Sequence, residues 1–251
     1  MYTDTEGIVL KNIKISGGRK ILVLFSLKYG KISAGTNINE KGRSKSTLAL
    51  RPFTYSKFEI YKSRENYNVN SAEVIKSFYK IGEDVDKYMY ASYILEFTEK
   101  IIVENERSPH IFDLLLSYLE TLEKRNKKYA TLALAYQLKA LFYVGCAPQT
   151  KKCVSCGEKD KLSYFSIKDG GLVCEDCFCK VKTNNIKESL IFDTNFGIIE
   201  VMNYILSNPL KNLENLALND ITQERLKQII KSYIAYHLDI KELKSESFLI
   251  E

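Results

Sequence analysis

The stretch "GIVLKNIKISGGRKILVLFSLKYGKISAG", residues 7–35, decides the class of the N-terminal part of this chain. It is rich in β-branched residues, and the glycines of "SGG" suit a tight turn between antiparallel strands. After the polar loop "TNINEKGRSKST", the segments "LALRPFTYSKFEIYKS" and "NYNVNSAEVIKSF" alternate apolar and polar positions. About five short strands with a long charged loop predict a small barrel of the OB type, and an SH3-like barrel fits the pattern nearly as well.

From about residue 80 the apolar residues recur at helical spacing, first in "EDVDKYMYASYILEFTEKIIVENE". A second helix is predicted from Ser108 as N-cap and Pro109 in the first turn, and a third should end at Gly145. Helical signals return beyond Thr183, in "NFGIIEVMNYILSN" and in a last helix with Thr222 as N-cap. The chain is therefore expected to be α+β, with a mainly helical C-terminal domain.

A cysteine-rich segment, "CVSCGEKDKLSYFSIKDGGLVCEDC", interrupts the helical pattern at residues 153–177. The arrangement C-x2-C-x17-C-x2-C has the spacing of a zinc ribbon or knuckle. Two residues between thiolates let one turn present both sulfurs to one ion, and four thiolates leave zinc no open position for a reacting water. We therefore predict a structural Zn²⁺ site formed by Cys153, Cys156, Cys174 and Cys177.

These patterns predict three domains. An OB-fold nucleic-acid-binding domain covers residues 1–80, a helical domain covers 81–150 and 182–251, and a zinc-binding insertion covers 151–181. The two remaining cysteines, Cys146 and Cys179, lie just outside the two pairs. Either could replace a ligand or pack in the core. We expect packing in the core, because Cys179 would bind the ion through a Cys-x-Cys pair, which is a less usual spacing.

Positive charge is concentrated at the N-terminus. Residues 1–67 carry 13 of the 37 Lys and Arg but only 5 of the 31 Asp and Glu, a net charge of +8, whereas the rest of the chain has a net charge of −2. A basic barrel favours contacts with nucleic-acid phosphates, with aromatic side chains such as Tyr61 as stacking platforms, although Phe53 and Phe58 are expected to fill the barrel. The predicted DNA-binding residues are Lys11, Lys14, Arg19, Lys20, Lys41, Arg43, Lys45 and Arg51.

The motifs of common enzymes are missing from the sequence. It contains no P-loop, no dinucleotide-binding glycine pattern and no nucleophile elbow, so the chain is not expected to be an enzyme. The acidic stretches "CEDC" and "EDVD" are expected to be solvated surfaces rather than nuclease sites. The longest apolar runs are far shorter than the roughly 18 residues of a membrane span, and a cytoplasmic protein with no membrane partner is expected.

Several segments together resemble the bacterial RecO family of DNA repair and recombination mediators. They are "TEGIVLKN", "GRSKSTL", "FYVGCAPQTKKCVSCG", "FSIKDGGLVCEDC" and "YIAYHLDIKELKSESFL", in the order of the family and along the whole chain. The phrase G-x-x-P-x-x-x-x-C-x-x-C-G is the most specific of them.

The resemblance implies an OB-fold, a helical domain and a zinc-binding unit in a protein that acts without ATP. It also implies binding of single- and double-stranded DNA, annealing of complementary strands, and partnership with RecR and with the C-terminal tail of single-strand-binding protein, which indirectly helps to load RecA. A cytoplasmic, nucleoid-associated location would follow. Two alternatives from the residues alone are a zinc-ribbon RNA-binding factor and a metal-dependent nucleic-acid enzyme.

Overall fold

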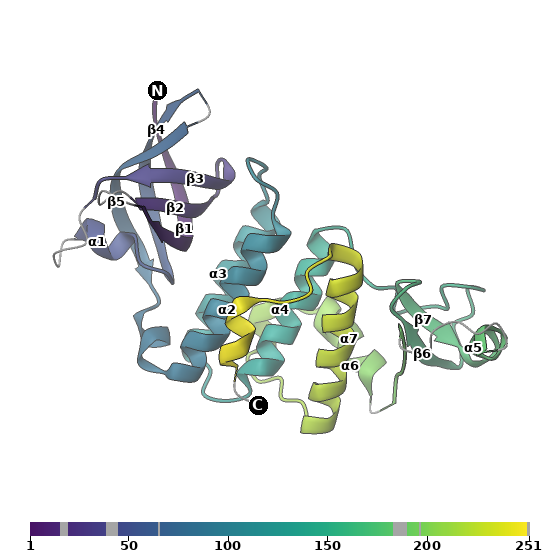
Figure 1. Ribbon diagram of the computed structural model, residues 1–251. Coiled ribbons are helices and arrows are strands. Elements are labelled where there is room, and N and C mark those ends of the chain that lie inside the picture. The colour runs from purple at the N-terminus through teal and green to yellow at the C-terminus, as the bar shows by residue number, and fades with distance from the viewer. Residues whose placement is uncertain (16–19, 39–44, 65, 183–189, 196, 250–251) are drawn as a thin grey trace. The chain divides into compact units, whose positions relative to one another are not determined.

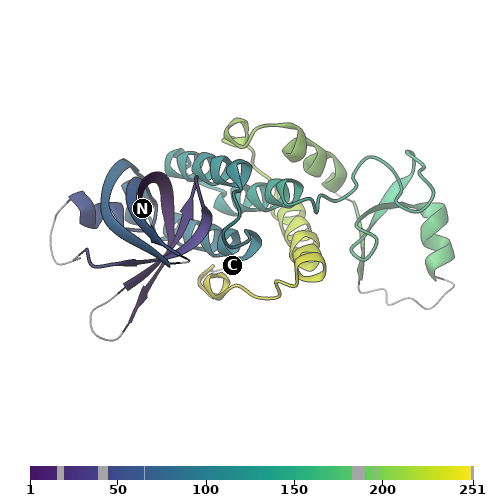
Figure 2. The ribbon, with the colours of Figure 1, turned by 90° about the horizontal axis from the view of Figure 1, so that it is seen from above.

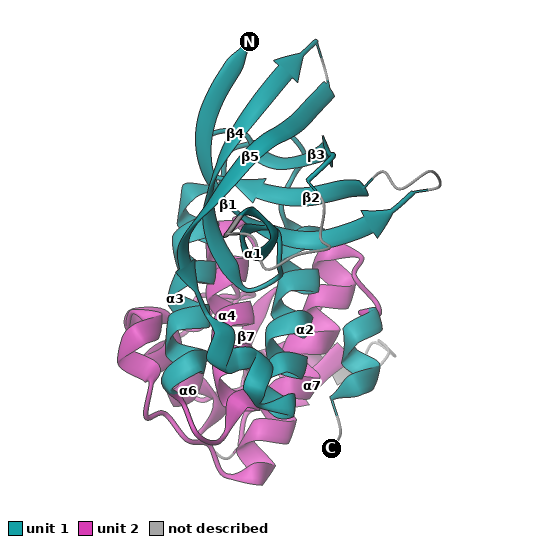
Figure 3. Ribbon diagram, turned by 90° about the vertical axis from the view of Figure 1, so that its left-hand side faces the viewer, with its two compact units in different colours: residues 1–124, 244–251 teal, residues 125–243 magenta. Residues whose placement is uncertain are grey.

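The computed structural model describes residues 1–15, 20–38, 45–64, 66–182, 190–195 and 197–249. Its chain divides into two compact units, residues 1–124 with 244–251 and residues 125–243 (Figure 3). The division follows contacts within each unit, whereas the three predicted domains follow changes of secondary structure along the sequence, and their limits remain a prediction. No helix among the described residues is long and apolar enough to cross a membrane.

The first unit begins with a closed barrel in the strand order β1-β2-β3-β5-β4 (Figure 1). The strands β3 and β5 pair in parallel and the other neighbours pair antiparallel, with α1 (Lys45–Ala49) between β3 and β4. This topology is that of the OB fold, so the predicted barrel is confirmed. Its strands are β1 (Tyr2–Lys14), β2 (Lys20–Ser26), β3 (Gly30–Thr36), β4 (Thr54–Ser63) and β5 (Asn66–Ser77).

The barrel closes because β1 serves two neighbours. The N-terminal half of β1 pairs with β4 and its C-terminal half pairs with β2, and the register shifts between Val9 and Lys11. Such a bulge bends a strand and increases its twist, which closure requires. Alternate positions fill the interior, which includes Val9, Leu22, Leu24, Ile32, Phe58 and Ile60.

Two helices, α2 (Val85–Ile101) and α3 (Pro109–Lys124), follow the barrel in the same unit. A 3-10 turn, η2 (Tyr79–Glu83), precedes them, and Asp84 caps α2 by accepting the Lys87 N–H at 3.0 Å. At the start of α3, the Ser108 carbonyl accepts the Phe112 N–H at 3.0 Å, as the sequence predicted. The same unit ends with a short 3-10 helix, η5 (Lys244–Phe248), which contacts α2.

The helices cover the outer face of β2 and β3. The Phe25 ring of β2 is fully buried and lies 5.2 Å from the Phe112 ring of α3. The Lys31 ammonium of β3 donates to the Glu99 carbonyl of α2 at 2.8 Å, and a Cβ on Gly30 would stand 1.8 Å from the Glu106 carbonyl oxygen. The helices of the same unit therefore cover this face near Phe25 and Lys31, whereas Ser33 farther along β3 is exposed.

The second unit is built around α4 (Tyr129–Tyr143), of which residues 131–141 are all buried. It contacts α6 (Ile198–Ser207), η4 (Leu210–Leu213) and α7 (Asp220–Leu238). The buried Arg125 guanidinium donates to the carbonyls of Lys127, Leu213, Glu214 and Leu216. Five N–H donors on one planar group let a single side chain satisfy several otherwise unpaired carbonyls, which ties the start of this unit to the loop after η4.

The last helix begins earlier than the sequence predicted. Asn219, not Thr222, is its N-cap, and the Asn219 side chain accepts the Thr222 N–H at 2.8 Å. Both residue types cap helices well, and the helix uses the first one because Asp220 and Ile221 can already adopt helical geometry.

The cysteine segment lies between α4 and α6, as predicted. It forms a three-stranded sheet in the order β7-β6-β8, with α5 (Glu175–Lys182) after β7. The strands are β6 (Leu162–Ser166), β7 (Gly171–Cys174) and β8 (Ile191–Asp193). The chain is therefore α+β, with a barrel, a helical part and an inserted cysteine unit.

Candidate metal centre and nucleic-acid surface

Four cysteines converge in the second unit. Cys153 and Cys156 come from the loop before β6, Cys174 ends β7, and Cys177 lies in the first turn of α5. Their sulfur atoms all lie within 4.8 Å of one another. The cluster contains the four cysteines that the sequence spacing predicted as ligands.

The loop that holds the first pair is a tight knuckle. The Gly157 N–H donates to the Cys153 carbonyl at 3.0 Å, and Gly157 has φ of +81°, a conformation in which a side chain would be strained. The Cys153 N–H donates to the Glu158 carbonyl at 2.7 Å, and the Cys174 N–H points to the Cys153 sulfur at 3.5 Å. Backbone hydrogen bonds therefore position both halves of the cluster.

The sulfur spacing fits a tetrahedral zinc ion. A Zn–S bond of about 2.3 Å at tetrahedral angles separates the sulfurs by about 3.8 Å. The Cys156 and Cys174 sulfurs are 3.7 Å apart. A set of four thiolates suits zinc, and it leaves no position for substrate or water, so the residues fit an ion that stabilises the fold.

Without a cation, the four thiols of the cluster would not all ionise near neutral pH. Burial opposes ionisation of Cys153, but N–H groups of Cys156, Cys174 and Ser155 donate to its sulfur and lower its pKa to about 6. Hydrogen bonding with Cys156, followed by burial, raises the pKa of Cys177 to about 12. The charge of one thiolate opposes ionisation of the neighbouring thiols. Four thiolates at these distances therefore need a positive ion among them.

The sheet beside the cluster depends on two glycines. Gly170 has φ of +77°, and a Cβ on Gly171 would stand 2.5 Å from the Gln149 carbonyl oxygen. That close approach lets Leu172 donate to Gln149 at 2.9 Å and Gln149 donate to Gly170 at 2.9 Å. Beside the cysteine cluster, the rings of Tyr164 and Phe178 stack 3.6 Å apart, centroid to centroid.

The remaining cysteines do not join the cluster. Cys146 is half-buried and Cys179 is exposed. The prediction that both pack in the core was wrong for Cys179, which is exposed on α5, whereas the neighbouring Phe178 ring stacks on Tyr164 of the sheet.

The predicted DNA-binding residues fall into two groups. Lys11, Lys14, Lys20 and Arg51 lie on the barrel, where Lys11, Lys14 and Arg51 are exposed and Lys20 is half-exposed. Arg19, Lys41 and Arg43 lie outside the described residues, and Lys45 begins α1 with a side chain that is also outside them. The DNA contacts of all eight remain predictions.

The structure brings Lys14 and Lys20 together. They face each other across the antiparallel pair β1–β2, at the end of a ribbon that extends beyond the barrel wall (Figure 2). Like charges directly opposite each other destabilise a strand pair. A phosphate group between the two ammonium groups would remove that repulsion. Lys11 is less available, because its ammonium lies 3.9 Å from the Glu99 carboxylate of α2.

The aromatic residues of the barrel differ in burial. Phe58 fills the interior as predicted, whereas Phe53 is buried against the Tyr88 ring of α2, 5.4 Å away. Only Tyr61 of this predicted group is strongly exposed, at 39%. Its cross-strand neighbour Tyr2 is 60% exposed, and the two rings are 5.1 Å apart. The sequence analysis did not single out Tyr2, although Tyr2 is the first residue of β1 and the alternation of that strand could have shown that it points outward.

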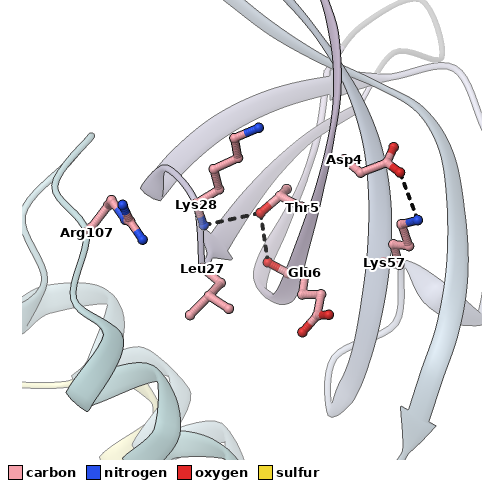
Figure 4. A pocket seen from close by; sticks show the side chains of 7 residues that line it. All are labelled: Asp4, Thr5, Glu6, Leu27, Lys28, Lys57 and Arg107. Carbon is pink, nitrogen blue, oxygen red and sulfur yellow. Dashed lines mark hydrogen bonds and ion pairs between the residues drawn. The ribbon is translucent and has the colours of Figure 1, made fainter.

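Two cavities of the first unit have mixed charge. One, about 290 Å³, lies between β1 and the segment before α3, where Asp4 pairs with Lys57 at 2.8 Å and Arg107 faces the strand (Figure 4). The other, about 630 Å³, is lined by Leu10, Phe53, α2 and η5. In it, Glu96 accepts hydrogen bonds from the backbone of Lys244 and Ser245 and from the Ser245 hydroxyl. Neither cavity presents a purely basic wall.

Comparison with known proteins identifies the family. Residues 1–78 match the family described as Recombination protein O N terminal, and residues 82–247 match Recombination protein O C terminal. The chain is 34% identical over 240 residues to the DNA repair protein RecO of Alkaliphilus metalliredigens, with 95% of each chain covered. It is 30% identical over 250 residues to the DNA repair protein RecO of Caldanaerobacter subterraneus, with 100% of this chain and 98% of the relative covered. This chain therefore belongs to the RecO family of DNA repair and recombination proteins.

Proposed function

We propose that this protein is a recombination mediator that binds single- and double-stranded DNA, anneals complementary strands and helps to load RecA onto coated single strands. The observation that carries the proposal is the match of both family domains over nearly the whole chain. The cationic end of the β1–β2 ribbon supports it, because annealing requires cations that screen the repulsion between two phosphate backbones.

We assign the predicted DNA contacts to Lys11, Lys14, Arg19, Lys20, Lys41, Arg43, Lys45 and Arg51. Phosphate contacts carry little sequence information, so binding should be nonspecific and sensitive to salt. Replacing Lys41, Arg43 and Lys45 together should weaken binding to single strands and duplexes alike.

The cysteine cluster supports a structural role for zinc. When bound, the ion would hold the knuckle of Cys153 and Cys156 to Cys174 and Cys177, and the four thiolates would complete its coordination. We infer that the protein acts without chemistry of its own at this site. The carboxylates nearest the barrel surface have other partners: Asp4 pairs with Lys57, and Glu6 accepts the Tyr55 hydroxyl.

The partners proposed are RecR and the C-terminal tail of single-strand-binding protein, with RecA acting downstream, in the cytoplasm on the nucleoid. Capture of the tail would concentrate the protein on coated DNA without any gain in intrinsic DNA affinity. If the coating protein lacking its tail recruited this protein equally well, that part of the proposal would be wrong.

The test is annealing of two complementary labelled oligonucleotides, bare and then coated with single-strand-binding protein, without nucleotide and with a chelator control. Faster annealing that tolerates coating, with both strands intact, is expected. Binding without annealing would favour an RNA-binding factor, and cleavage that a chelator prevents would favour an enzyme.

A further inference from the structure

The cysteine cluster has one exposed member. Cys153 and Cys174 are 1% and 3% exposed and belong to the buried core of the cysteine unit. Cys177 is half-buried, whereas Cys156 is exposed. The loop around Cys156 faces open space, because a Cβ on the next residue, Gly157, would meet nothing within 4 Å. A small polar reagent in solvent therefore reaches the Cys156 sulfur more readily than the others of the cluster.

The exposed sulfur has a buried partner close to it. The sulfurs of Cys156 and Cys174 are 3.7 Å apart. Cys174 is the last residue of β7 and pairs with Leu162 of β6, so the sheet holds this partner in place. A disulfide bond is about 2.0 Å long, and small rotations of the two side chains would bring the sulfurs to that distance.

Cysteines that respond to oxidants share two features. Their sulfur is an accessible thiolate, and a second thiol lies beside it to resolve the oxidised form. Cys156 has both features when it is a metal ligand, since a ligating cysteine is deprotonated. Cys179 is also exposed, but its sulfur is not among those that lie within 4.8 Å of one another in the described part of the chain. The two exposed cysteines therefore differ in what surrounds them.

We propose that Cys156 is a site of oxidation by hydrogen peroxide and that Cys174 resolves the oxidised sulfur as a disulfide. First, the Cys156 thiolate attacks one peroxide oxygen, so that an S–O bond forms, the O–O bond breaks and hydroxide leaves. The Cys174 thiolate then attacks the Cys156 sulfur, so that an S–S bond forms, the S–O bond breaks and a second hydroxide leaves. Two electrons pass from the sulfurs to the peroxide, and two protons from solvent convert both hydroxides to water.

The disulfide would remove two of the four thiolates that hold zinc. Cys153 and Cys177 alone do not complete a tetrahedral site, so the ion is lost. Because metal binding at such sites contributes to folding, the cysteine unit should loosen until a thiol reductant restores the ligands. The inference goes beyond the proposed function, since it concerns the cysteine unit and needs no DNA.

The test treats the full-length, zinc-loaded protein with hydrogen peroxide, blocks free thiols with N-ethylmaleimide and maps disulfides in tryptic peptides by mass spectrometry. Residues 153–159 form one tryptic peptide and residues 169–180 form another. A Cys156–Cys174 disulfide joins these two peptides, whereas a disulfide within either Cys-x-x-Cys pair stays inside one. The joined peptides should appear together with one released zinc per chain, measured with a zinc-sensitive dye. A thiol reductant with added zinc should reverse both changes.

Two variants that keep a fourth ligand separate oxidation from loss of the fold. Histidine can replace one cysteine at a zinc site of this kind. Cys156→His removes the exposed thiol, and under the same peroxide it should release zinc about tenfold more slowly, or slower still. Cys177→His is the matched control, because it also has three cysteines but keeps Cys156 and Cys174. It should release zinc and form the joined peptides as the unaltered protein does.

Three results would overturn the inference. The first is an initial disulfide inside one Cys-x-x-Cys pair. The second is oxidation of Cys179 at peroxide concentrations that leave zinc bound. The third is release of zinc at equal rates from Cys156→His and Cys177→His, once zinc content and thermal midpoint without peroxide have shown that both are folded. If either variant binds no zinc, the peptide map of the unaltered protein decides alone. Annealing is measured separately, so failure of the proposed function would leave this test intact.

Discussion

At the scale of the residue, local backbone geometry positions the four cysteines of the cluster. Backbone N–H groups point at the Cys153 sulfur, and the sulfurs of Cys156 and Cys174 have the separation of a tetrahedral site. The spacing along the chain predicted these ligands because each pair is a local turn. It did not reveal which backbone groups would support them.

Cys153→Ser tests the structural role of the ion. The variant should bind far less than one zinc per chain and should unfold at a lower temperature, because binding free energy at thiolate sites is folding free energy. Zinc content by mass spectrometry and thermal unfolding by circular dichroism measure both. The control is Cys179→Ser, an exposed cysteine outside the cluster, which should change neither.

The opposite outcome is equally informative. Suppose that Cys153→Ser bound no zinc, kept its fold and its thermal midpoint, but lost all annealing. The ion would then have to act in annealing itself, and the structural assignment would be wrong.

At the scale of the element, packing of β7 against residue 149 depends on the absence of a side chain. Gly171→Ala would place a Cβ 2.5 Å from the Gln149 carbonyl oxygen and 2.9 Å from its nitrogen, both of which are backbone atoms. We expect a loss of about 1–3 kcal/mol in the free energy of unfolding, as for other overpacked sites. Urea unfolding measures it.

A matched control lies in η2. A Cβ on Gly82 would meet nothing within 4 Å, so Gly82→Ala should be neutral or slightly stabilising. Equal stability of the two variants would show that β7 moves away without cost.

The Glu96 carboxylate of α2 binds the start of the C-terminal 3-10 helix η5. Burial raises the pKa of Glu96, but hydrogen bonds from the Ser245 hydroxyl, from the backbone N–H groups of Ser245 and Lys244, and the charge of Lys100 outweigh it and lower the pKa below its ordinary value. A carboxyl group whose pKa is lower in the folded state stabilises the fold above its unfolded pKa. That stabilisation is lost as the pH falls through the folded pKa.

Glu96→Gln should therefore be less stable than the unaltered protein at neutral pH, by about 1–3 kcal/mol, because charged hydrogen bonds are lost. The difference should shrink as the pH is lowered from 7 to below about 4. Urea unfolding across this range measures it, and hydrogen exchange at the amides of Lys244 and Ser245 reports on η5 directly. Parallel stability curves would show that Glu96 is not the charged acceptor.

At the scale of the whole molecule, the net positive charge and the cysteine cluster lie in different parts of the chain. The N-terminal 67 residues carry the net positive charge, and the cysteine cluster lies far along the sequence in the second unit. DNA affinity and metal-dependent stability should therefore be separable properties.

Lys14→Gln/Lys20→Gln tests this separation. Each lost phosphate contact should reduce the slope of log affinity against log salt by about 0.7 to 0.9. The control is Lys151→Gln/Lys152→Gln, an exposed pair beside the first cysteine knuckle, which removes the same charge from the second unit. Titrations of duplex DNA at several salt concentrations measure the slopes, and equal slopes for the two double variants would contradict the assignment.

Local patterns in the sequence determined a large part of this protein. Strand alternation predicted the barrel, helical periodicity predicted the elements after residue 80, and Cys-x-x-Cys spacing predicted the ligand set, because each signal spans only a few residues. The Asn219 cap was missed because Asn219 and Thr222 are both good capping residues. The exposure of Cys179 was missed because a buried and an exposed cysteine cannot be told apart from sequence alone.

Only the tertiary structure decided which surface of the barrel is open. Helices α2 and α3 cover the outer face of β2 and β3 near Phe25 and Lys31, whereas Tyr2 and Tyr61 meet on the barrel although 58 residues lie between them in the sequence. The facing of Lys14 by Lys20 likewise depends on strand register. Register and helix docking are contacts between distant segments, and no local pattern of residue types specifies them.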